Sequence, residues 1–252
     1  MSGIAALLLA AAAVLQEPPA PRNGPEIVPR QGGSSPGPIF SLSGEGRISV
    51  PVDGEVVPSR TEWFFFVPTT IKGTRYDDLF SNGTGVCLEA TLTWEHPSRV
   101  NEALIWHTGA YLRMSYDAFE GTSHSDEIGN FIDARSWEIT TAIVGFRGGI
   151  RGTSGLFAEG RVGVGPVYYG AVKATFDIEG GLPATGELLA PTVGVASELG
   201  LKLGYRSEKM EIAFGMNLEI QGGPHRGDDV STVVKPDAIL FVSFTLGIGL
   251  RF

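Results

Sequence analysis

The sequence is poor in cysteine and in clustered positive charge, and both shortages exclude classes of protein. Cys87 is the single cysteine in 252 residues, so an intrachain disulfide is excluded. It lies far from the N-terminus and outside the small-residue context that lipidation needs, which disfavours a lipoprotein anchor. The formal net charge is -9 and the 19 Lys and Arg residues form no basic stripe, so nucleic acid is not an expected partner.

Long apolar runs are also scarce. The longest covers residues 4–15, IAALLLAAAAVL, which is shorter than the ~20 residues of a membrane-spanning helix and is typical of a signal-peptide core. Ala11, Ala12 and Ala13 offer a cleavage site nearby, whereas the Lys or Arg expected before such a core is missing. We therefore expect a signal peptide at residues 1–15. A buried helix of a cytosolic protein is the alternative.

The next segment is rich in proline and poor in apolar residues. Residues 16–38, QEPPAPRNGPEIVPRQGGSSPGP, are typical of a linker that builds no core. Residues 39–54 alternate only weakly, so either a short strand or an ordered tether is possible there. The expected organisation is a Pro/Gly-rich periplasmic extension at 16–54, followed by one domain at 55–252.

From about residue 55 the hydrophobic pattern has a period of two, which indicates strands with two different faces. In 239–252, for example, Leu240, Val242 and Phe244 alternate with Ser243 and Thr245. The pattern predicts eight strands, at 56–67 (rich in phenylalanine, with its phase not fixed), 84–95, 103–117, 135–147, 155–166, 192–206, 209–221 and 239–252.

Charges and glycines share one face of these strands. Away from the strand ends, the apolar faces carry no charged residue. Alternation of this kind also occurs in soluble barrels, with the charged face in water. Glycines such as Gly163, Gly200 and Gly247 would only weaken a solvent-exposed face, whereas they suit the narrow interior of an eight-stranded barrel. This favours an apolar face that looks outward to lipid.

The connections alternate in length, as they do in membrane barrels with short periplasmic turns and long outer loops. Short links are expected at 96–102, 148–154 and 207–208, and long ones at 68–83, 118–134, 167–191 and 222–238. This pattern predicts that both termini are periplasmic. Aromatic side chains on the apolar faces fall at the levels where membrane interfaces would lie: Trp94, Trp106, Tyr116, Trp137 and Tyr205. The predicted fold is an all-β, eight-stranded, antiparallel up-and-down transmembrane β-barrel.

The last strand, LFVSFTLGIGLRF, has apolar residues at every second position and ends on an aromatic one: Phe244, Leu246, Ile248, Leu250 and Phe252. It resembles the C-terminal insertion signal of bacterial outer-membrane β-barrel proteins. The wider likeness, to small porin-like barrels with eight strands, covers roughly residues 55–252. The resemblance implies a Gram-negative-type envelope, location in the bacterial outer membrane, and the barrel-assembly machinery as a partner during insertion.

The inward charges predict an interlocked network, because isolated charges in a narrow lumen are very costly. The network is expected to include Glu89, Arg113, Glu138, Glu159, Arg161, Glu198, Lys202, Glu211, Glu219 and Arg251. With Glu95, Asp117 and Arg206 added, the inward strand positions hold eight acids and five bases. A largely filled lumen without a wide pore is expected, and the acidic excess leaves open a restricted, slightly cation-preferring conduit.

Enzymatic chemistry has weak support. His107 and Ser115 share a face with Asp117, but eight residues along one strand separate them by ~26 Å. His225, Asp228 and Asp229 in an outer loop could hold a divalent cation, although such loops are usually just solvated. We expect no catalytic residue, metal or cofactor.

Three functional hypotheses remain. The leading one is a structural outer-membrane barrel, or one that lets small solutes pass to a limited extent, present as a monomer in the lipid bilayer. The second is an outer-membrane enzyme that acts on lipid or peptide. The third is a soluble exported barrel that binds an apolar ligand.

Overall fold

The computed structural model contains a closed antiparallel barrel of eight strands, in the order β1-β17-β15-β14-β11-β10-β7-β6. It describes residues 37–57, 60–64, 67–71, 73–97, 101, 103–125, 131–177, 183–227 and 236–252. The predicted signal peptide at 1–15 and most of the predicted extension lie outside these residues. The barrel strands are β1 (Ile39–Asp53), β6 (Gly83–Pro97), β7 (Leu104–Phe119), β10 (Trp137–Gly152), β11 (Leu156–Tyr169), β14 (Thr192–Arg206), β15 (Met210–Gln221) and β17 (Ile239–Arg251).

The first barrel strand differs from the prediction. β1 closes the cylinder by pairing Gly46 with Leu246 of β17 on one side and with Val86 of β6 on the other. The segment 56–67, predicted as the first strand, lies in the connection between β1 and β6. There β2 (Glu55–Val57) pairs with β5 (Thr74–Arg75), and β3 (Arg60–Phe64) pairs with β4 (Val67–Ile71). The barrel therefore begins at residue 39, and the predicted boundary at residue 55 is wrong.

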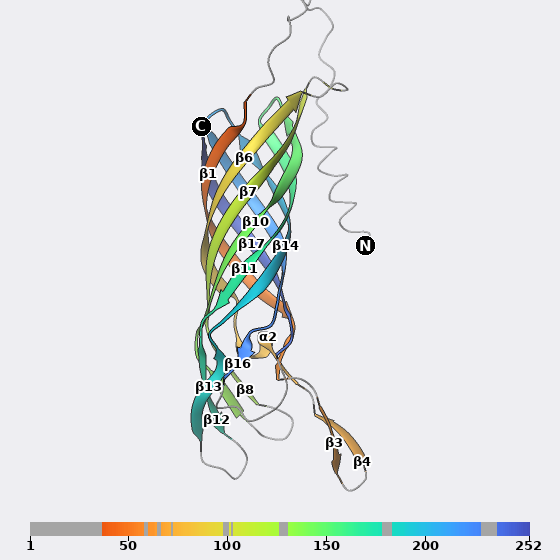
Figure 1. The fold of residues 1–252 in the computed structure, drawn as a ribbon, viewed down its shortest axis with the longest axis vertical. Helices are drawn as coiled ribbons and strands as arrows, with labels where there is room; N and C mark the ends of the chain where they lie inside the picture. Colours follow the sequence, from red (N-terminus) through yellow and green to blue (C-terminus); the bar gives the residue numbers. More distant parts are fainter. Residues whose placement is uncertain are drawn as a thin grey trace, which may run out of the picture.

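The two ends of the barrel are unlike. The connections β6–β7, β10–β11 and β14–β15 are short, and they lie at the end where β1 begins and Phe252 terminates the chain (Figure 1). We call this the turn end. The other end, the loop end, carries the four long connections. This asymmetry agrees with the loop lengths expected from the sequence.

The long connections at the loop end are themselves folded. α2 (Tyr76–Leu79) lies across the barrel mouth. Beyond it stands a five-stranded sheet in the order β16-β13-β12-β9-β8, and the β3–β4 hairpin projects away from the barrel (Figure 1). The strands of this sheet are β8 (Ser123–Ser125), β9 (Phe131–Ala134), β12 (Val172–Asp177), β13 (Ala184–Ala190) and β16 (His225–Arg226).

A glycine and several backbone hydrogen bonds hold the α2 segment in place. Gly54 has a φ of 116°, and a Cβ there would lie 2.6 Å from the carbonyl oxygen of Ala238. Its own carbonyl accepts a hydrogen bond from the Tyr76 backbone. On the other side, the Thr122 backbone donates to the Leu79 carbonyl at 2.8 Å. The α2 segment is thus joined by backbone hydrogen bonds to the strand end before it and to the β7–β8 connection.

Candidate functional site: the filled lumen and its loop-end seal

The barrel wall is inverted relative to that of a soluble barrel. Outward side chains along the strands are large, apolar and exposed, for instance Val86 at 62%, Leu199 at 62% and Leu246 at 66%. Buried inward positions hold charged residues such as Glu89, Arg113 and Lys202. Apolar side chains gain no stability by facing water. A wall with apolar side chains outside and polar side chains inside is the arrangement expected when lipid hydrocarbon surrounds the barrel. Among the described residues, no helix is long and apolar enough to cross a bilayer.

The lumen network is balanced in charge. We define it as the charged side chains on inward strand positions, each of which pairs with at least one opposite charge. It comprises eight carboxylates and eight cations: Glu45, Glu89, Glu95, Asp117, Glu159, Glu198, Glu211 and Glu219, with Arg47, Arg113, Arg147, Arg151, Arg161, Lys202, Arg206 and Arg251. The prediction of an acidic excess in the lumen is therefore wrong. The electrostatic reason to expect a preference for cations is lost with it.

Nearest the turn end, two carboxylates organise the network. Glu95 accepts from Arg151 and from Arg251, each at 2.8 Å. Deeper in, Glu159 accepts from Arg147 at 2.5 Å and from Arg206 at 3.1 Å. Glu95 thus joins strands that are not neighbours in the sheet, because it lies on β6 and Arg251 on β17. The two partners of Glu159 on β11 come from the adjacent strands β10 and β14.

In the middle of the lumen, cations bridge several carboxylates. The Lys202 ammonium lies 2.7 Å from Glu45 and 3.3 Å from Glu89. The Arg161 guanidinium lies 2.5 Å from Glu89 and 3.1 Å from Glu198. Charged groups that share partners in this way compensate one another's charge, which is what burial in a narrow lumen requires.

Toward the loop end, Glu219 is the central acceptor and is fully buried. It pairs with Arg47 at 2.9 Å and with Arg113 at 2.8 Å. Arg47 also reaches Asp117 at 3.0 Å, while Arg113 also pairs with Glu198. Removing any one of these partners would leave the buried network with one charge too many of the opposite sign, which is a costly change in such a site.

Of the ten residues predicted for the network, Glu138 is misplaced. It is exposed, whereas Trp137, Ile139 and Ile143 on the opposite face of β10 are buried. The predicted phase of this strand is therefore inverted. Its first residues lie beyond the charged part of the lumen, where the interior is apolar, so apolar character there marks the inside.

Sequence reasoning missed four lumen charges. Glu45 and Arg47 lie on β1, where residues 39–54 had been left open. The polar series Ser43, Glu45, Arg47 and Ser49 could have revealed that strand. Arg147 and Arg151 were missed because both lie on β10, the strand whose phase was predicted the wrong way round. Arg151 lies near the downstream end of this strand.

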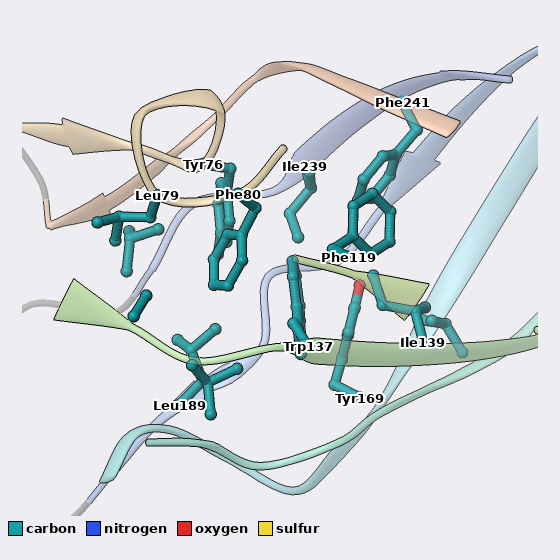
Figure 2. Close-up of a cluster of buried hydrophobic side chains, with 14 of the residues drawn as sticks. Tyr76, Leu79, Phe80, Phe119, Trp137, Ile139, Tyr169, Leu189, Ile239 and Phe241 are labelled. Atoms are coloured by element: carbon teal, nitrogen blue, oxygen red, sulfur yellow. The ribbon is translucent and has the colours of Figure 1, made fainter. Parts of the chain in front are cut away.

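The loop end of the lumen is closed by an apolar cluster that we call the loop-end seal. Figure 2 shows Tyr76 and Phe80 of the α2 segment facing Trp137. The Trp137 ring stacks with Tyr76 and with Tyr169, each at a centroid distance of 5.6 Å. Other members come from several barrel strands and loops: Leu79, Phe119, Ile139, Leu188, Leu189, Ile239 and Phe241. Burial raises the pKa of the Tyr76 hydroxyl above its ordinary value.

Trp137 is therefore a core residue and not an interface aromatic. The other predicted interface residues point outward, with exposures between 38% for Trp94 and 55% for Trp106. Tyr116 and Tyr205 are likewise exposed on the outer wall. The residues of the predicted insertion signal also face outward, from Phe244 at 39% to Phe252 at 73%.

The structure does not bring the proposed catalytic residues together. His107 lies in the lumen with its Nε2 atom 3.1 Å from Glu159. Ser115 lies farther along β7, beside Thr141 and Arg47. The described residues contain no group of three or more His, Cys, Asp or Glu side chains that could hold a metal ion. Asp228 and Asp229, named for the loop site, lie outside them.

Fold, inverted wall and filled lumen together define a small transmembrane β-barrel of the outer-membrane type. Sequence comparison matches the chain to no known protein family and to no curated protein. Among solved structures it is similar to Ail of Yersinia pestis, with 15% identity over 86% of this chain and 99% of Ail, and a TM-score of 0.39. It is similar to OprG of Pseudomonas aeruginosa, with 12% identity over 86% of this chain and 96% of OprG, and a TM-score of 0.39. It is also similar to OmpT, the outer-membrane protease of Escherichia coli, with 12% identity over 88% of this chain and 99% of OmpT, and a TM-score of 0.39.

Proposed function

We propose that this protein is a closed, structural outer-membrane barrel and not a solute channel. The observation that carries the proposal is the content of the lumen. Buried ion pairs occupy its length, and the loop-end seal covers them on the side of the long loops. A solute would have to displace both ion pairs and packed aromatics to pass.

Charge balance supports the same proposal. A conduit that prefers ions of one sign needs groups of the opposite sign exposed to the permeating ion. Here each carboxylate of the lumen network is already paired with a cation. The network stabilises the barrel by joining strands across the lumen, and this leaves the folded loop end as the part exposed to the cell's surroundings.

The bilayer and the barrel-assembly machinery are the partners that this proposal includes. The outward series from Phe244 to Phe252 lies on β17 and at the chain end, where the resemblance to an insertion signal was noted. Lipid-dissolved spin labels test the membrane placement: they should broaden the signal of probes at 199 and 203 but not at 198 and 202. Equal broadening at both pairs would contradict it.

Conductance across planar bilayers tests the closed lumen. The folded wild-type chain is first identified by heat-dependent migration in SDS gels. It is expected to give no steady ohmic current in 1 M KCl. The Debye length at this salt concentration is about 3 Å, so charges are strongly screened. As a positive control, a double Arg161→Ala and Lys202→Ala variant removes two long side chains from the middle of the lumen. A steady wild-type current, with or without cation selectivity, would overturn the proposal in favour of limited solute passage.

A further inference from the structure

The outer wall carries a groove over β10 and β11 that the lumen chemistry does not use. It is lined by Phe146, Gly148, Gly160, Val162 and Leu199, with Arg147 and Arg161 at its floor. Gly148 and Gly160 are direct partners in the β10–β11 ladder. Two adjacent strands therefore lack side chains at directly paired outward positions of the wall.

The barrel itself does not require glycine at these two positions. A Cβ at Gly160 would have no atom nearer than 4.0 Å, and one at Gly148 none nearer than 3.6 Å. The inward glycines of the same strands differ, because a Cβ at Gly163 would lie 2.4 Å from the Tyr111 hydroxyl and one at Gly149 2.2 Å from a backbone oxygen. Glycine weakens a strand, so the outward pair has a cost that the packing of the barrel does not explain.

A protruding side chain stands beside the groove. Phe146 is 73% exposed, more than its neighbours Val144 and Val162 at 59% and 57%. A knob and a hole of this kind on one wall suit a two-fold axis, since a symmetric pair places each copy's Phe146 against the other copy's groove. Within a bilayer, close protein contacts favour small residues because apolar side chains gain nothing over lipid by associating.

Another part of the wall shows the contrast. Outward positions of β15 and β17 carry bulky side chains such as Phe214, Leu246 and Ile248. Such a surface suits fluid hydrocarbon, whereas a rigid groove with an adjacent knob suits a partner of fixed shape. We propose that two copies of this chain associate in the membrane through the β10–β11 wall, with Phe146 of each seated on Gly148 and Gly160 of the other. This departs from the monomer expected from the sequence.

Cysteine cross-linking in lipid vesicles tests the proposal. Val144→Cys places a thiol beside Phe146, while the native Cys87 is buried in the lumen. With a short bismaleimide, at one chain per several thousand lipids, Val144→Cys should give a cross-linked dimer. Leu246→Cys, on the β17 wall, should give at least tenfold less. Equal yields from the two positions would indicate random collision and overturn the proposal.

Filling the groove provides the matched pair of variants. Gly160→Leu, added to Val144→Cys, should lower the dimer yield at least tenfold. Gly46→Leu is the control, because Gly46 is an outward glycine of β1 whose Cβ would also have no atom nearer than 4.0 Å. Each variant is first checked for heat-dependent migration, so that a folding defect is not counted as lost association.

Two outcomes would overturn the proposal at this step. The dimer yield could be unchanged in Gly160→Leu. Alternatively, native mass spectrometry of detergent-released wild type could show single chains with a retained phospholipid that Gly160→Leu loses, which would make an acyl chain the occupant. Neither result bears on the conductance experiment, so this inference and the proposed function fail separately.

Discussion

The lumen network and the loop-end seal are equally buried but are built from opposite chemistry. Glu219 and Lys202 in the network are as inaccessible as Trp137 and Tyr169 in the seal. The network lies within the strand-lined lumen whose wall faces lipid, and the seal lies where the barrel meets its loops. One closed cylinder thus contains a charged interior over most of its length and an ordinary apolar core at one end.

The difference teaches how the surroundings decide which face of a strand is apolar. Where lipid surrounds the wall, outward residues must be apolar and the polar ones face inward. At the loop end the interior is closed by α2 and loops, so apolar residues also pack inside, as in a soluble core. Ile239 and Phe241 are buried while Leu240 and Val242 on the same strand face outward. Both faces of one segment are then apolar, and alternation no longer distinguishes them.

The largest expected effect is at the centre of the seal. Trp137→Ala removes a ring that contacts Tyr76, Phe80, Phe119 and Tyr169. Leaving a cavity among packed aromatics should lower the free energy of unfolding by about 3–5 kcal/mol. Urea unfolding in lipid vesicles measures this, and the loss should be nearly the same at low and high salt. A loss below about 1 kcal/mol would show that the seal is not a packed core.

The network should respond next, through charge instead of volume. Glu219→Gln keeps the side-chain shape but leaves Arg47 and Arg113 without their shared carboxylate. We expect a loss of about 3 kcal/mol, at the lower end of the range for breaking a buried pair, because the amide oxygen still accepts one hydrogen bond. The double variant Glu219→Gln with Arg113→Met should recover part of the loss. Additive losses in the two single variants would mean that these charges do not interact.

A smaller effect is expected where an aromatic side chain belongs to the network. The Tyr111 hydroxyl donates to Glu198 at 2.9 Å, and its ring lies 5.8 Å from the Arg161 guanidinium. Tyr111→Phe keeps the ring and removes one hydrogen bond to a charged acceptor, so the expected loss is about 1.5–2 kcal/mol. Tyr116→Phe, on the outer wall, serves as the control and should change stability much less. If both variants behave alike, the buried hydrogen bond adds nothing.

Much of the barrel could be predicted from the sequence, because seven of its strands keep a strict alternation where lipid surrounds them. β1 was missed for a physical reason. Its outward positions include Gly44 and Gly46, so the apolar series that marks a membrane strand is interrupted. The polar inward series was intact, and it is the inward face that the narrow lumen constrains most. Aromatic residues at 63–66 instead drew the prediction to a segment that forms a hairpin in the loop.

The site was predicted unevenly for the same reason. The pairing of inward charges follows from burial alone, so Glu89, Arg161 and Glu198 could be named from their faces. Which charge pairs with which depends on the register of strands distant in sequence, as when Arg47 of β1 meets Glu219 of β15. The seal could not be predicted, since it is assembled from α2, from barrel-strand ends and from loops whose meeting point no local pattern encodes.

The smallest effect sharpens the comparison at the boundary of the two regions. Glu138 belongs to β10 next to Trp137 but is exposed, so Glu138→Gln should change the free energy of unfolding by less than about 0.5 kcal/mol. It is the same chemical change as Glu219→Gln, on the same kind of strand, with the opposite orientation. Measured side by side in vesicles, the two variants should therefore differ by more than 2 kcal/mol, because only the loss of a buried carboxylate leaves the buried cations in excess. A large loss for Glu138→Gln would mean that β10 has the phase first predicted, and that Trp137 faces the membrane after all.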